Sequence, residues 1–198
     1  MIPAGTGTFA MASRRVEITS NTYENNQAVD IALISGLVVE DAAAWELSEA
    51  SLVGDWDDLG LLAGDTAGTI TNFRNENIVV SGNSHSGSGT KPFSSLDQEL
   101  GLLLRVLYSP DPVDNVLYDT IGESSFNETD PTMNSNDNHI CVGGNTNGTF
   151  ASIQLDLQAM TDGSSPILRL PTAPFAPFDC TALDGGPAIV PSDAPVGG

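Results

Sequence analysis

Histidines and cysteines are the residues most able to do chemistry in this chain, and they are few. The 198 residues include two histidines, His85 and His139, and two cysteines, Cys141 and Cys180. A zinc site needs three or four His, Cys or carboxylate ligands at characteristic spacings, and neither a CxxC nor an HExxH motif occurs. His139 and Cys141 together would supply only two ligands. The sequence therefore predicts no transition-metal site.

The two cysteines could instead pair with each other. A disulfide between Cys141 and Cys180 would close a loop of 39 residues. Such a bridge would add about 3–4 kcal/mol of stability by restricting the unfolded chain. Two buried free thiols are the alternative, because the sequence does not reveal whether the compartment is oxidising. Both possibilities stay open at this point.

A serine nucleophile beside a histidine would be the other reactive arrangement. Ser84, His85 and Ser86 stand side by side in the segment 83–92, NSHSGSGTKP. A catalytic serine and its histidine face each other across a fold, and no GxSxG motif is present. The glycines before Lys91 also lack the GK[ST] step of a phosphate-binding loop. This composition predicts a mobile linker.

Paired carboxylates could serve a sugar hydrolase. Asp55, Asp57 and Asp58 flank Trp56, which would place a general acid and a general base near a stacking platform. The chain has 26 acidic residues, so clusters of this kind are expected by chance. A carboxylate-dependent carbohydrate hydrolase is therefore an alternative, and the main expectation is that the chain is not an enzyme.

A calcium loop is the one cofactor site that the sequence suggests. The segment 130–138, DPTMNSNDN, places oxygen-bearing side chains at alternate positions, as calcium ligands often stand. The glycine and glutamate of an EF-hand are missing at the corresponding positions. A turn satisfied by its own Asx side chains is the alternative. The candidate ligands are Asp130, Asn134, Asn136 and Asn138.

The charge excludes several partners. Only six basic residues oppose the 26 acidic ones, giving a net charge of −20, and Lys91 is the only lysine. Such a surface repels phosphate backbones and anionic lipid, so no nucleic-acid partner is expected. No apolar run approaches the length of a membrane span. The first residues have neither a basic region nor an apolar region, so no secretory signal peptide is expected there.

The elements that must position these residues are mostly strands. Alternating and β-branched residues predict strands, and two pairs of them resemble hairpins. Helix-favouring residues after a good N-cap predict one helix, and a charge pattern that matches the helix dipole predicts a second. No internal repeat is evident. The expected strands are 14–19, 28–39, 115–121 and the hairpins 69–82 and 139–160, and the expected helices are 42–53 and 95–108, with a strand over 102–108 as the alternative to the second helix.

These elements predict an α+β fold that is rich in strands, with a β-sandwich or barrel-like body and one or two helices. We expect a single globular domain over residues 14–170. Residues 1–13 would form an extended N-terminal arm, and residues 171–198, with six prolines and four glycines, would form a C-terminal arm. Phe175 and Phe178 could anchor the second arm on a neighbouring copy, and docking on the same chain is the alternative.

An acidic, strand-rich body with extended arms predicts a structural subunit. The main expectation is a self-assembling homo-oligomer that contacts itself and other structural proteins, such as a capsid, decoration or tail protein in the virion of a tailed phage. The first alternative is an extracellular filament, pilus or adhesin subunit, stabilised by a disulfide or by calcium. The second alternative is the carbohydrate hydrolase described above.

Overall fold

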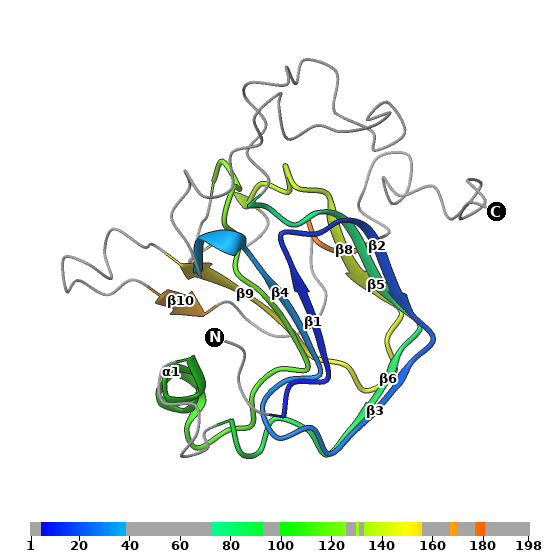
Figure 1. The fold of residues 1–198 in the computed structure, drawn as a ribbon, viewed down its shortest axis with the longest axis vertical. Coiled ribbons are helices and arrows are strands. Elements are labelled where there is room, and N and C mark those ends of the chain that lie inside the picture. Colours follow the sequence, from blue (N-terminus) through cyan, green and yellow to red (C-terminus); the bar gives the residue numbers. More distant parts are fainter. Residues whose placement is uncertain are drawn as a thin grey trace, which may run out of the picture.

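The chain winds into stacked coils of parallel strands (Figure 1). The computed structural model describes residues 5–38, 73–92, 100–125, 130, 133–155, 167–169 and 177–180. The elements in chain order are β1 (Thr8–Met11), β2 (Arg14–Thr19), β3 (Thr22–Glu24), β4 (Ile31–Ile34), a 3₁₀ turn (Gly36–Val38), β5 (Glu76–Ser81), β6 (Ser84–Ser86), α1 (Leu100–Tyr108), β7 (Val116–Tyr118), β8 (Ile140–Gly143), β9 (Phe150–Leu155) and β10 (Ile167–Arg169).

Three sheets form the walls of these coils. The strand orders are β2-β5-β8, β3-β6 and β1-β4-β7-β9-β10. Every neighbouring pair is parallel except β9 and β10. The chain thus passes from one sheet to the next and returns to the first sheet one strand further along, which is the architecture of a parallel β-solenoid.

The expected class is confirmed at the level of a strand-rich, mostly β fold with a helix, but the predicted strand pairing is wrong. A sandwich is built from antiparallel neighbours, whereas these strands pair in parallel with the strand of the next coil. The predicted hairpin 139–160 is a clear case: β8 pairs with β5, and β9 pairs with β7. Its two strands lie in different sheets. The strand predicted at 14–19 coincides with β2.

A period of 62 residues relates the coils, which corrects the expectation that no repeat exists. Hydrogen bonds join equivalent polar residues at this separation. The left-handed backbone conformation recurs at the same separation of 62 residues, and positions in this conformation favour glycine and asparagine. The residues with positive φ include Arg15, Asn77 and His139 in one set, and Ser20, Gly82 and Gly144 in a second set. The first set lies at or next to the start of β2, β5 and β8, and the second set lies directly after the end of each of these strands.

Aliphatic side chains fill the interior of the coils in rows. Because paired parallel strands are in register, side chains of equivalent position stack from coil to coil. One row is Ile18, Val80 and Val142, and another is Ile31, Val116 and Phe150. All are buried. The alternation of Val16 and Ile18 therefore identifies the inner face of β2, whereas β4 and β9 also bury their outer faces, through Ala32, Ile34, Ala151 and Ile153.

Helix α1 covers the outer face of the sheet that contains β4, β7 and β9. Leu104 and Tyr108 of the helix are buried in the same cluster as Ala32, Leu117 and Ala151 of the sheet. This confirms the part of the predicted helix 95–108 that the structure describes. Residues 95–99 and the predicted helix 42–53 lie outside the described residues. None of the described helices is long and apolar enough to cross a membrane.

The described parts of both expected arms contact the body of the same chain. β1, within residues 1–13, pairs with β4. Phe178 is fully buried, and its ring contacts Tyr118 and Phe150. Cys180 forms a disulfide with Cys141 of β8. Phe175, the other expected anchor, lies outside the described residues.

Candidate functional site

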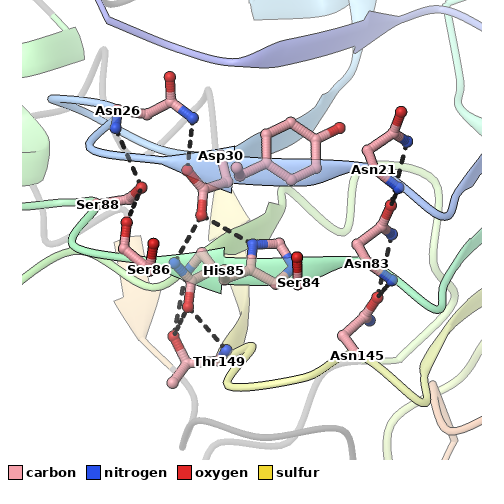
Figure 2. Close-up of polar contacts among 12 residues, drawn as sticks. Asn21, Asn26, Asp30, Asn83, Ser84, His85, Ser86, Ser88, Asn145 and Thr149 are labelled. Carbon is pink, nitrogen blue, oxygen red and sulfur yellow. Dashed lines mark hydrogen bonds and ion pairs between the residues drawn. The ribbon is translucent and has the colours of Figure 1, made fainter.

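A buried carboxylate and imidazole form the centre of the site. Asp30 stands at the corner between β3 and β4, and His85 is the middle residue of β6. His85 Nδ1 lies 2.8 Å from Asp30 Oδ2, and neither side chain is exposed to solvent. Tyr23 of β3 stacks on the imidazole with the ring centroids 5.3 Å apart. Figure 2 shows this pair between two successive coils.

Amide side chains complete the shell of Asp30. Asn26 Nδ2 donates to Oδ1 at 2.7 Å, and Asn115 Nδ2 donates to Oδ2 at 2.8 Å. Burial by itself raises the pKa of Asp30, but hydrogen bonds from His85, Ser88, Asn26 and Asn115 outweigh it and hold that pKa below its ordinary value. Asp30 is therefore an ionised acceptor, and His85 Nδ1 carries the proton that it donates.

The prediction of a mobile linker at 83–92 is wrong, because part of this segment is a strand of the packed coils. Strand β6 and the fully buried Asn83 lie within this segment. Small and polar residues predominate here because each coil must turn a tight corner, not because the segment is a free linker. The flanking serines do not complete a catalytic triad: Ser84 Oγ bonds Thr22 Oγ1 at 3.3 Å, and neighbouring strand residues face opposite sides. Among the described residues, His85 Nε2 is buried without a hydrogen-bond partner.

A row of three asparagines runs along the next corner. Asn83 Oδ1 accepts hydrogen bonds from the backbone N–H and the side chain of Asn21, at 3.0 and 3.1 Å. Asn83 Nδ2 donates to Asn145 Oδ1 at 3.0 Å and to the carbonyl of Ile18 at 2.8 Å. Asn145 Nδ2 repeats this with the carbonyl of Val80 at 3.1 Å. This asparagine row, Asn21, Asn83 and Asn145, joins all three coils (Figure 2).

A second group of carboxyls lies at the opposite end of β7. Asp119 accepts hydrogen bonds from the backbone N–H groups of Ser35, at 2.5 Å, and of Ile121, at 3.2 Å. Burial raises the pKa of Asp119 to about 7. Burial also raises the pKa of Glu123, whose carboxylate accepts from the hydroxyl of Tyr118 at 2.7 Å. These oxygens accept hydrogen bonds from several segments of the chain, among them Ser35 and Asp137, so the group fixes the backbone of neighbouring coils and loops.

The candidate calcium ligands are distributed between the surface and the protein interior. Asn136 donates to the carbonyls of Ile140, at 2.8 Å, and Pro177, at 3.0 Å, and accepts from the N–H of Ile140. Asn138 Nδ2 donates to Tyr118 Oη at 2.6 Å. Asp130 is exposed and Asn134 is buried. Two of the amides thus serve the turn itself. No group of three His, Cys, Asp or Glu suited to a metal occurs in the described part of the chain.

The connection between β6 and β7, in which the backbones of Gly89 and Val113 contact each other, lines much of two hollows. The Val113 N–H donates to the carbonyl of Gly89 at 3.0 Å. The first hollow has a volume of about 340 Å³, and Lys91 and Arg105 line it. The second has a volume of about 510 Å³, and its lining includes His85. We call them the basic hollow and the polar hollow.

Some of the predicted site residues lie outside the described part of the chain, and sequence reasoning overlooked others that the structure brings together. Asp55, Asp57 and Asp58, on which the hydrolase alternative depends, lie outside the described residues. Asp30 was missed because its partner His85 is 55 residues away. The asparagine row had a signal in the sequence, because a short polar step, SNT, GNS or GNT, follows β2, β5 and β8 in turn.

Comparison with protein-family models, curated proteins and solved structures finds no match to this chain.

Proposed function

We propose that this chain is a non-enzymatic structural subunit of an extracellular assembly, a filament or an adhesin. The observation that carries the proposal is that the buried polar groups form their hydrogen bonds with neighbouring coils. The asparagine row and the Asp30–His85 pair spend their hydrogen bonds on neighbouring coils. Groups that join coils stabilise a rod, whereas a catalyst must leave its reactive groups accessible to a substrate.

The disulfide favours the extracellular setting. Cys141 lies on β8, the last strand of its sheet, and its bond to Cys180 ties residues 177–180 over that strand. The Val142 N–H donates to the carbonyl of Phe178 at 2.7 Å in the same region. Disulfides persist in oxidising compartments and are rare in the cytosol. The acidic surface, with a net charge of −20, keeps such a subunit soluble until it assembles.

A virion protein is the second candidate, as a capsid, decoration or tail component of a tailed phage. It is supported by the same stacked coils, since strand β2 has no partner on its outer side among the described strands and could pair with a neighbouring subunit. The two settings differ in redox chemistry, because a virion subunit would fold in a reducing host cytosol. Incubation of the folded chain with glutathione at cytosolic poise, followed by mass analysis of the thiols, separates them: a bridge that resists favours the extracellular role.

Light scattering over a range of concentrations tests the structural role. We expect particles larger than the 20.6 kDa chain, growing with concentration. A truncated chain of residues 1–180 keeps Phe178 and Cys180 and tests whether the predicted C-terminal arm contributes to assembly. A compact monomer at every concentration, for the full and the truncated chain, contradicts the proposal.

A further inference from the structure

The two ends of the stack of coils differ in how their strands are covered. Residues 177–180 lie along the outer side of β8, where the Val142 N–H donates to the carbonyl of Phe178 at 2.7 Å, and β10 pairs antiparallel with β9. At the other end β1, β2 and β3 begin the three sheets, and none of them has an outer neighbour among the strands that the structure describes (Figure 1). We call residues 8–24, which contain these three strands, the open edge.

The backbone of β2 gives the open edge its hydrogen-bonding groups. The Ser20 N–H donates to the carbonyl of Ser81, directly after β5, at 3.3 Å. Because the peptide groups along a strand point to alternate sides, the N–H and C=O groups of Glu17 and Thr19 point away from β5. Both residues are exposed. Peptide groups of this kind are a template on which another strand can pair.

The charge of the chain indicates which partner fits the open edge. Residues 1–25 hold two arginines and two glutamates and so have no net charge, whereas residues 26–198 hold the other four basic and 24 acidic residues and with them the whole charge of −20. A basic partner would be attracted to the acidic faces instead. Two copies of this chain repel each other least where they meet through the open edge, which favours a second copy as the partner.

The side chains of β2 are complementary to those of a second β2. When both copies use the same edge the contact is two-fold symmetric, so the two strands run antiparallel. The exposed Arg15 and Glu17 flank the partly buried Val16, whereas Arg14 is already paired with Glu76 at 3.4 Å. In a register centred on Val16, each Arg15 faces Glu17 of the second copy, and the two valines meet. A register centred on Glu17 would place two carboxylates opposite each other, which is unfavourable.

We propose that two copies of this chain join through the open edge as a two-fold symmetric pair, with β2 against β2 and Arg15 against Glu17 of the second copy. This inference rests on the structural role proposed above, and it names the partner and the contact surface. The pair closes on itself at this edge, so a larger particle grows through other surfaces of the pair.

Sedimentation equilibrium over a range of protein concentrations tests the pair. We expect the first associated species to have twice the mass of the 20.6 kDa chain. Arg15→Glu and Glu17→Arg should each weaken the dimer by about 10-fold or more, because each change places like charges opposite each other twice in the pair. An equimolar mixture of these two variants should recover the dimer, and so should the double variant Arg15→Glu with Glu17→Arg, because arginine and glutamate then face each other again.

Two further variants separate this contact from general effects of charge. Lys91→Glu makes the same change in net charge as Arg15→Glu, outside the open edge, and should leave the affinity of the dimer unchanged. Thr19→Pro removes an N–H that points away from β5, so it should prevent pairing and keep the fold. Urea unfolding of each variant confirms that the fold is intact.

The outcomes separate this pairing from the broader structural role. Equal losses in Arg15→Glu and Lys91→Glu, or no recovery in the mixture and the double variant, overturn the pairing. Larger particles whose formation is unaffected by these variants also overturn the pairing, but they leave the structural role in place. A chain that stays monomeric at millimolar concentration overturns both.

Discussion

Removal of the central asparagine of the row should destabilise the chain far more than removal of either neighbour. The side chain of Asn83 makes four hydrogen bonds, that of Asn145 makes three, and that of Asn21 makes one. Asn83 is fully buried, Asn145 is partly buried and Asn21 is exposed. A hydrogen bond contributes about 1 kcal/mol net, and a buried group that loses its partner costs about 1–3 kcal/mol.

These values give a graded expectation. Asn83→Ala strands the buried carbonyl of Ile18 and removes all four bonds, so the free energy of unfolding should fall by about 3–5 kcal/mol. Asn145→Ala should lower it by about 2–3 kcal/mol, and Asn21→Ala by less than about 1 kcal/mol. Asn83→Asp should be no milder than Asn83→Ala, because a carboxylate cannot donate to the carbonyl of Ile18 and would bury a charge.

Urea unfolding followed by circular dichroism measures this series. Ser86→Ala, on an exposed residue of β6 outside the row, is the control and should change the free energy by less than about 0.5 kcal/mol. Equal losses at Asn21 and Asn83 would refute the reasoning, since the coils would then not depend on the buried member of the row.

Four other predictions have signs that follow from the structure. Because the pKa of Asp119 is raised from 3.8 to about 7, its contribution to stability is present in full below pH 4 and is lost as the pH rises through 7; the free energy of unfolding obtained from urea curves should fall over this window by up to about 1.4 kcal/mol per pH unit, and a flat profile would contradict it. Asp30, with a lowered pKa, contributes the opposite dependence, present above pH 4 and lost at more acidic values. The double change Cys141→Ser and Cys180→Ser opens a loop of 39 residues and should lower the free energy of unfolding by about 4 kcal/mol relative to the oxidised wild type. Reduction of the wild type should lower it by the same amount, and urea unfolding of both proteins measures this. Gly89→Ala places a Cβ 2.3 Å from the carbonyl oxygen of Val113 and should destabilise by more than about 2 kcal/mol, whereas Gly144→Ala, also at positive φ but with nothing within 4 Å, should cost only about 1 kcal/mol.

Strand positions could be predicted from the sequence, but strand partners could not. The alternation of Val16 and Ile18 identifies β2 because it reports which side chains face the interior. It does not report the neighbouring strand, and a short connection such as the one between β8 and β9 is normally a sign of a hairpin. Here the partner of β8 is β5, a whole period away, and the short connection is a corner between two sheets.

The buried site could not be predicted for a related reason. His85 stands among serines and glycines, whose composition is typical of flexible linkers. In stacked coils the same composition occurs at corners, where left-handed residues such as Gly87 turn the chain and a single inward side chain can be fully buried. Long connections between β4 and β5, and between β6 and β7, lie within the 62-residue period, so β4, β7 and β9 are unequally spaced along the chain and the period is hard to see in the sequence.

The basic hollow follows from one of these unequal connections. In the first coil β3 passes to β4 through residues 25–30, and in the third coil β8 passes to β9 through residues 144–149. In the second coil the corresponding connection runs from residue 87 to residue 115 and contains Lys91, α1 and Arg105. In the first and third coils a short connection is enough to close the coil. The extra length of the connection in the second coil is therefore not needed for stacking. Surface loops of this kind are where a rigid scaffold acquires binding sites, and this one brings two of the few cations of the chain to a preformed hollow.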